Sequence, residues 1–143
     1  MIQFQFALVA DAGHIDSGSG KVSLIGEFSA IFAKALPASA SMVVLSRWLA
    51  DAADVKDREV PLEVELTGPD EKQITRSSKL PLSFEPPSEF VQVEGKRRAT
   101  ILLQVVNQSF PKHGDYAFRF YLDGEPNGSI TFSVTPPPKK PQG

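Results

Sequence analysis

The stretch from residue 111 to residue 134, "PKHGDYAFRFYLDGEPNGSITFSV", decides the fold. Its large apolar side chains recur at every second position and alternate with smaller or polar ones, which is the period of a half-buried β-strand. Asp123-Gly124 is a dipeptide favoured at tight hairpin turns, so we expect residues 116–122 to pair with residues 129–134. Pro126 fits a bulge or an edge, where its missing N–H costs little. The alternating residues expected to face the core are Tyr116, Phe118, Phe120 and Leu122.

The start of this hairpin resembles the last hairpin of immunoglobulin-like sandwiches. Lys112, Gly114, Tyr116 and Phe118 stand at the spacing of the antibody-type pattern Asp-x-Gly-x-Tyr-x-Cys. Lys112 replaces the Asp of the pattern, and Phe118 replaces the Cys. The resemblance implies that the Tyr116 hydroxyl bonds the backbone at the start of the strand, the arrangement called a tyrosine corner, and that Phe118 fills the core.

The rest of the chain is divided by twelve prolines and ten glycines into short segments rich in Val, Ile, Phe and Leu. This spacing favours an all-β sandwich over a helical bundle. In the first strand we expect Phe4, Phe6 and Leu8 to share one face, and the third strand is expected to be central because both its faces are apolar. We expect about eight strands, at residues 2–10, 21–31, 41–49, 60–66, 73–79, 97–107, 116–122 and 129–134, with residues 91–94 as a possible short edge strand.

These expectations define an antiparallel two-sheet sandwich, immunoglobulin-like or Greek-key, in a single domain over residues 1–135. Residues 136–143, "PPPKKPQG", cannot pair into a sheet and are expected to form a flexible tail. Such a tail is a possible ligand for a proline-reading domain, although a plain terminus is the commoner role.

The chain as a whole resembles a family of small bacterial proteins of unknown function. The similarity rests on an opening strand that ends in Ala10-Asp11, on Lys21–Ser39 ("KVSLIGEFSAIFAKALPAS") and on Phe110–Glu125 ("FPKHGDYAFRFYLDGE"). Each piece has low specificity, but together they lie toward both ends of the chain. The resemblance supports the fold and implies no activity.

Composition excludes several classes of function. The chain has 143 residues, a formal net charge of −2 and no cysteine, which removes disulfides, thiolate catalysis and Cys-ligated zinc. The charge balance argues against nucleic-acid binding. No segment approaches the roughly 20 apolar residues of a membrane span, and the first residues lack the basic region of a signal peptide. We therefore expect a cytoplasmic protein that has no membrane or nucleic-acid partner.

Asp11, His14 and Asp16 form the most plausible metal-ligand group, since oxygen and nitrogen donors lie within six residues. Calcium sites need more acidic ligands than this segment offers. A polar turn between two strands, in which Asp side chains cap backbone N–H groups, is the favoured interpretation, and metal binding stays open. The following Gly18–Lys21, "GSGK", lacks the spacing of a phosphate-binding loop.

Two charged groups have ordinary structural explanations. Asp51, Asp54 and Asp57 are interleaved with basic residues, which is typical of a solvated loop or turn. The cluster "KRR" at residues 96–98 has the charge to contact a phosphate, but charges at the start of a strand more often protect an edge against mispairing.

Aromatic and histidine residues offer little chemistry. Trp48, Arg47 and Tyr121 are a possible sugar-stacking platform, but Trp48 lies within an apolar strand and is expected in the core. His14 and His113 lie in expected loops, without a nucleophile to activate.

No residue is therefore assigned a catalytic, cofactor-binding or metal-binding role. The preferred hypothesis is a non-enzymatic module that binds a protein partner or a second copy of itself through edge strands and a tail. The alternative is a module that binds calcium, a carbohydrate or another small ligand through the loops at one end of the sandwich.

Overall fold

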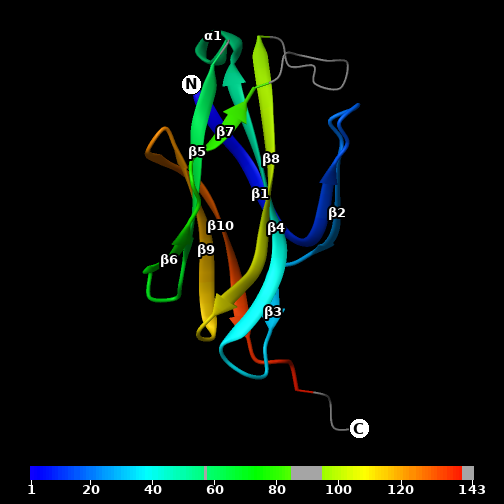
Figure 1. Cartoon of the computed structure of the whole chain (residues 1–143), viewed down its shortest axis with the longest axis vertical. Helices are drawn as coiled ribbons and strands as arrows, with labels where there is room; N and C mark the ends of the chain where they lie inside the picture. The colour runs from blue at the N-terminus through cyan, green and yellow to red at the C-terminus, as the bar shows by residue number, and fades with distance from the viewer. Residues whose placement is uncertain (57, 85–94, 140–143) are drawn as a thin grey trace.

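The computed structural model describes residues 1–56, 58–84 and 95–139 and shows an all-β protein with one helical turn (Figure 1). Ten strands are present among these residues rather than about eight, because the expected segment 21–31 forms two strands and an additional strand follows residues 73–76. The elements are β1 (Ile2–Ile15), β2 (Val22–Glu27), β3 (Ala30–Phe32), β4 (Ala38–Asp51), α1 (Ala52–Val55), β5 (Glu59–Thr67), β6 (Gln73–Arg76), β7 (Leu80–Ser83), β8 (Lys96–Phe110), β9 (Gly114–Leu122) and β10 (Glu125–Thr135).

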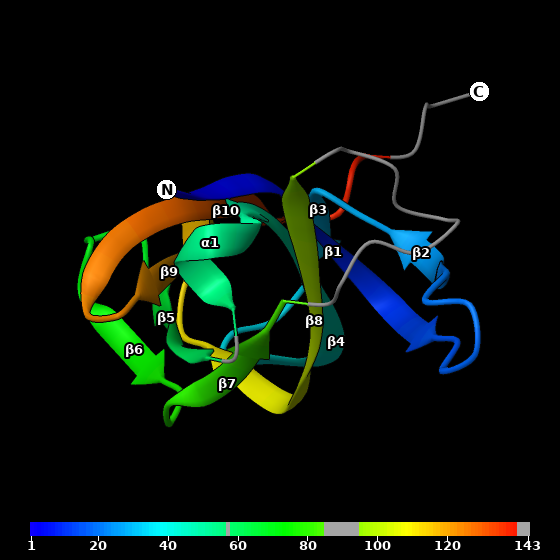
Figure 2. The same ribbon diagram turned by 90° about the horizontal axis from the view of Figure 1, so that it is seen from above.

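The strands form two sheets that pack face to face (Figures 1 and 2). Sheet A has the strand order β2-β1-β4-β8, and sheet B has the order β3-β10-β9-β5-β6, with β7 also pairing with β5. Every pair is antiparallel except β3 with β10, which is parallel. The all-β two-sheet sandwich predicted from the sequence is therefore confirmed, with one parallel pair in addition.

The core between the sheets is built around aromatic rings. Trp48 is fully buried on β4, contacts Phe4 and Phe120 edge-on at ring distances of 5.2 and 5.9 Å, and donates its Nε1–H to Ser46 Oγ at 3.0 Å. Such edge-to-face contacts add to the free energy gained by burial, and the hydrogen bond satisfies the only polar atom of the indole. Trp48 is thus a core residue, as expected, and cannot stack on a sugar.

The tyrosine corner implied by the resemblance is present. The buried Tyr116 donates its hydroxyl proton to the carbonyl oxygen of Lys112 at 2.7 Å, four residues earlier in the chain. Phe118, which stands in place of the pattern's cysteine, is buried and stacks on Phe132 at 5.5 Å. Both expectations for this hairpin are confirmed.

The faces of the first strand differ from the prediction. A bulge interrupts the pairing of β1 with β4 between Phe4 and Phe6, because Phe4 lies opposite Trp48 while Phe6 lies opposite the next residue, Arg47. One extra residue in a strand moves every later side chain to the other face of the sheet. Phe4 therefore packs in the core, whereas Phe6 and Leu8 point to the outer face of sheet A. The expectation that all three share one face was wrong.

The second predicted strand, residues 21–31, is divided between the sheets. Gly26 has a φ of +70°, which glycine adopts without strain, and β2 ends at the next residue. The Phe28 N–H then bonds to the Val9 carbonyl, and the chain crosses to sheet B, where β3 pairs with β10. The expected strand at residues 91–94 lies outside the described residues.

Candidate interaction surface along β8

The three candidate metal ligands do not lie together in one turn. Asp11 and His14 are in strand β1, not in a loop as expected, because β1 continues to Ile15 and pairs with β2. Asp16 alone lies in the turn, where its Oδ2 accepts hydrogen bonds from the N–H and Oγ of Ser19 at 2.8 and 2.6 Å. These bonds favour the charged carboxylate and lower the pKa of Asp16. The described residues hold no group of three or more His, Asp or Glu side chains arranged to bind a metal ion.

The acidic group after β4 forms ion pairs. Asp51 binds Lys96 and the amino group of Met1, and Asp54 binds that amino group too. The pKa of Asp51 is lowered, mainly through its hydrogen bond with Lys96. Asp57 lies outside the described residues.

The other predicted candidates are also dispersed. His113 bonds through Nε2 to the backbone carbonyl of Ala33 at 3.0 Å. Arg47 lies on the outer face of sheet A and Tyr121 on the outer face of sheet B, so the structure does not bring them together with Trp48. No sugar-stacking platform is formed by these three residues.

The outer face of sheet B is polar and internally paired. Arg76 binds Glu63 at 2.7 Å and Glu65 at 3.4 Å, and its guanidinium lies 4.2 Å from the ring centre of Tyr121. The Tyr121 hydroxyl donates to Glu65 at 3.2 Å. This network is typical of a solvated sheet face and leaves little apolar surface for a partner.

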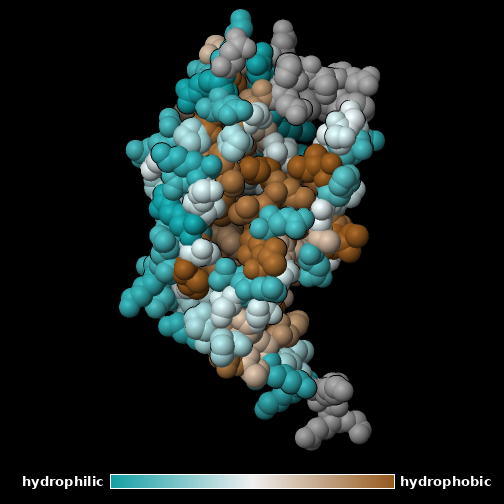
Figure 3. Space-filling view, in the orientation of Figure 1, coloured by the Kyte–Doolittle hydropathy of each residue, from teal (hydrophilic) through white to brown (hydrophobic). Residues whose placement is uncertain are grey.

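The outer face of sheet A is apolar instead. Residues paired across antiparallel strands share a face, so Leu8, Leu45 and Leu102 form one row across β1, β4 and β8. Phe6, Arg47 and Thr100 form the next row. Apolar surface gathers along β8 and extends toward β2, with hydrophilic side chains around it (Figure 3). Contiguous apolar surface with a polar rim marks interaction sites more often than isolated exposed residues do.

The β1–β2 hairpin covers one part of this face. A Cβ placed on Gly13 would lie 2.7 Å from Leu24 Cδ2 and 3.3 Å from side-chain atoms of both Leu102 and Val43. After the part of β1 that pairs with β4, the strand therefore folds over the outer face of sheet A. Because Gly13 has no side chain, it permits this close approach. Ile25 on this hairpin remains 72% exposed.

Strand β8 lies at the edge of sheet A, and most of its apolar residues are only partly covered, although Ala99 and Phe110 are buried. On β4, which has neighbours on both sides, residues 42–45 are at most 4% exposed. On β8, Ile101, Leu102, Leu103 and Val105 are half-buried and Val106 is 69% exposed. Among the described residues, no strand pairs with the outer edge of β8 (Figure 1). We call residues 99–106 the β8 edge.

Basic side chains lie at the start of this edge. The Nε of Arg97 and the Nε of Arg98 are buried without a hydrogen-bond partner. Arg47 is diagonal to Arg98 across the β4–β8 pair, donates from Nε to Thr100 Oγ1 at 3.2 Å and lies over the Phe6 ring at 5.4 Å. Burial and the nearby charge of Arg98 lower the pKa of Arg47. Within the described parts of the chain, these three arginines form no ion pair.

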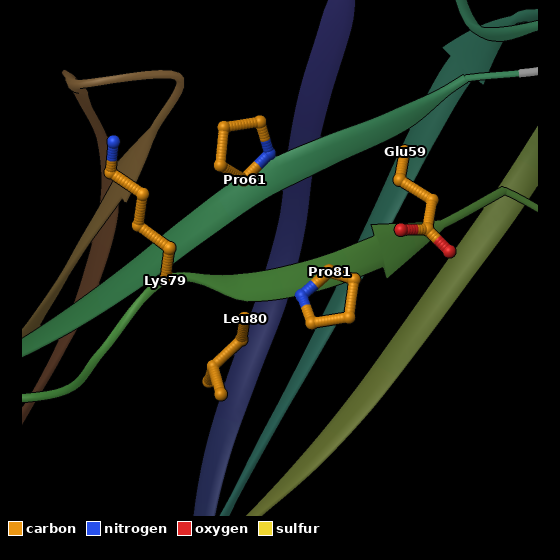
Figure 4. Close-up of a pocket in the computed structure, with 5 residues that line it drawn as sticks. All are labelled: Glu59, Pro61, Lys79, Leu80 and Pro81. Atoms are coloured by element: carbon orange, nitrogen blue, oxygen red, sulfur yellow. The ribbon is translucent and has the colours of Figure 1, made fainter.

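A shallow, open pocket of about 220 Å³ lies on the outer side of β5 and β7 (Figure 4). Pro61 and Pro81 face each other across the two strands, and Glu59 and Lys79 lie at opposite ends of the pocket. The volume is below the roughly 300 Å³ at which small-molecule sites usually begin. Its two charges do not converge on one point, so the pocket points to no particular ligand.

Sequence reasoning did not single out residues 99–106. The signal in the sequence was the uncharged run "ATILLQVV", which directly follows "KRR". Its apolar residues occupy both odd and even positions, and therefore both faces of a strand. A strand of this kind is expected at the centre of a sheet, whereas β8 is an edge strand among the described strands.

Comparison with known proteins places the chain in a family but not in a functional class. None of the described helices is long and apolar enough to span a membrane. No curated protein and no solved structure matches the chain. The model of a family of unknown function (DUF6941) matches residues 5–135, which is nearly the whole chain. The protein therefore belongs to this family of unknown function.

Proposed function

We propose that the protein is a non-enzymatic interaction module that binds an extended segment of a protein partner along the β8 edge. The single observation that carries the proposal is the partial exposure of apolar residues on both faces of this edge. An added strand would pair with the backbone groups of β8 that no described strand uses, and it would cover Leu102 on one face and Leu103 on the other. Such strand addition obtains affinity from backbone hydrogen bonds and specificity from alternate side chains.

The topology supports the same position for the partner. We propose an immunoglobulin-like arrangement in which β1, β4 and β8 correspond to strands A, B and E, and β5, β9 and β10 to strands C, F and G. Immunoglobulin constant domains have a further strand, D, beside strand E. No described residue of this chain pairs at the corresponding side of β8, so a partner's strand would complete the sheet there.

A pair of matched variants tests the proposal. Val106→Lys adds a charge to the β8 edge, and Ile25→Lys makes the same change at an equally exposed position on β2. Charged side chains on an edge strand oppose pairing with another strand. We expect Val106→Lys to lose partners that wild type retains in affinity purification from the native host, or to lose self-association in light scattering.

The control variant Ile25→Lys should keep these interactions, and both variants should melt within a few degrees of wild type. The proposal fails if wild type is monomeric at all concentrations and recovers no partner. It also fails if the two variants lose the same interactions, because the effect would then not be specific to β8.

A further inference from the structure

The arginines next to the β8 edge indicate the chemistry of the partner, provided that the proposed function is correct. Arg98 and Arg47 hold two positive charges side by side on the outer face of sheet A, and their mutual repulsion is unfavourable. Lys96, at the same strand end, is paired with Asp51, whereas no carboxylate of the described residues pairs with Arg98 or Arg47. Among the described residues, the buried side-chain donors without a hydrogen-bond partner are the Nε atoms of Arg97 and Arg98, both at this strand end.

The Arg98 guanidinium is not satisfied within the described residues, because its Nε has no hydrogen-bond partner there. That Nε is itself buried, so an incoming acceptor would bond to the terminal amino groups, and a hydrogen bond to a charged group is stronger than one to a neutral group. A carboxylate is the acceptor that a guanidinium binds best in geometry and in charge. Phe6, below Arg47 at 5.4 Å, and Thr100, bonded to its Nε, hold that side chain in place on the face.

The β8 edge itself calls for a different chemistry. Residues 99–106 contain no charged side chain, and their half-buried Ile, Leu and Val residues lie on both faces of the strand. A bound strand would cover these side chains best if it had apolar residues on both of its faces. The favourable partner is thus acidic at one end and apolar along the remainder.

A second copy of this chain does not meet this requirement through symmetric pairing. Strand β8, "KRRATILLQVVNQSF", contains neither Asp nor Glu, so a β8–β8 pair would bring no carboxylate from that strand to Arg98. It would bring three further basic residues to the joined sheet. Charge complementarity therefore favours a different protein.

We propose that the strand which pairs with β8 comes from another protein, with an Asp or Glu beside Arg98 and Arg47 and apolar residues beside residues 101–106. Within a continuous sheet, paired residues share a face, so this carboxylate projects from the outer face of sheet A, where both guanidinium groups lie. The apolar residues extend the row formed by Leu8, Leu45 and Leu102 by one strand.

The test is a selection of random 12-residue peptides, displayed on phage, against the full chain and against Arg98→Glu. Wild type should enrich peptides in which an acidic residue flanks an alternating apolar segment, and Arg98→Glu should enrich Lys or Arg at the same place. A reversal of charge preference is a readout that a purely structural role of Arg98 would not produce.

Affinity measurements on one selected acidic peptide give the magnitude. Arg98→Gln should weaken its binding by roughly 10- to 100-fold, the effect of losing one or two charge-assisted hydrogen bonds. Lys96→Gln, which removes a charge that is already paired with Asp51, should change the affinity less than about threefold. Both variants are first compared with wild type in thermal unfolding, and Arg98→Lys provides a folded replacement if Arg98→Gln is destabilised.

The outcomes separate the two proposals. Peptides that bind wild type and are lost in Val106→Lys, but show no acidic preference, overturn the inference and leave the proposed function standing. Self-association that Val106→Lys abolishes, without any peptide binding, identifies a second copy as the partner and overturns the inference. If no peptide or protein binds in a way that depends on β8, both proposals fall.

Discussion

At the scale of single residues, Gly128 shows how one position closes the sandwich. It lies on the β9–β10 hairpin with a φ of +87°, and a Cβ at this position would overlap the ring of Phe4. Phe4 in turn packs on Trp48 and Phe120. The absence of a side chain thus lets sheet B approach the first strand of sheet A. Gly124, in the turn of the same hairpin, has a similar φ of +84° but faces open space.

These two glycines form a matched pair for a stability measurement. Gly124→Ala should lower the free energy of unfolding by about 1–2 kcal/mol, through backbone strain alone. Gly128→Ala adds displacement of the Phe4 ring and should lower it by about 2–5 kcal/mol. Guanidinium unfolding of both variants gives the comparison. Equal losses would show that the contact with Phe4 has no energetic importance.

At the scale of elements, the last hairpin was predictable in detail, whereas the faces of β1 and the division of residues 21–31 into two strands were not. The hairpin of β9 and β10 follows from local alternation and a turn dipeptide, which depend only on neighbouring residues. The bulge between Phe4 and Phe6 has no such signal, since the sequence alternates regularly through it. The return of Gly13 onto sheet A depends on contacts with Val43 and Leu102, residues far away in the chain.

The candidate site was hidden for a related reason. Strands β4 and β8 both have apolar residues at both parities, so the sequence assigns them the same environment. Only the strand order shows that β4 is central and β8 is an edge. The cluster "KRR" did indicate an edge, and the structure places it at the start of one.

This difference between β4 and β8 predicts a pattern of hydrogen exchange. Amide protons of β4 are bonded on both sides of a central strand, whereas those of β8 that point away from β4 have no strand partner among the described residues. We expect the outward amides of residues 99–106 to exchange on the order of 100-fold faster than the amides of residues 42–49. NMR-detected exchange measures both sets in one sample. Equal protection would mean that the β8 edge is covered in the isolated protein.

At the scale of the whole molecule, the chain passes from sheet A to sheet B between β8 and β9, and Tyr116 holds this passage. Its hydroxyl bonds to the Lys112 carbonyl, while its ring packs against Phe110 at the end of β8 and Phe132 on β10. One side chain therefore connects the last strand of sheet A, the crossing segment and the centre of sheet B.

Removing the hydroxyl tests this connection. Tyr116→Phe removes both hydrogen bonds between the Tyr116 hydroxyl and the Lys112 backbone, one to the carbonyl and one from the N–H, and should lower the free energy of unfolding by about 1–3 kcal/mol. Ser133→Ala removes a hydroxyl whose hydrogen bond to Asp115 is exposed, so water can replace it, and this variant should cost less than about 1 kcal/mol. Denaturant unfolding of the two variants distinguishes these roles, and a larger loss from Ser133→Ala would contradict them.

The placement of the first and last strands gives the molecule a definite response to mechanical force. Strand β1 starts near one end of the long axis, and β10 ends near the other (Figure 1). Tension applied between these points pulls β1 lengthwise past β4 and β10 lengthwise past β9. Hydrogen bonds in antiparallel ladders run perpendicular to the strands, so this load strains many of them together instead of opening them one at a time. Stretching along this axis therefore meets the sandwich in its stiff, shearing direction.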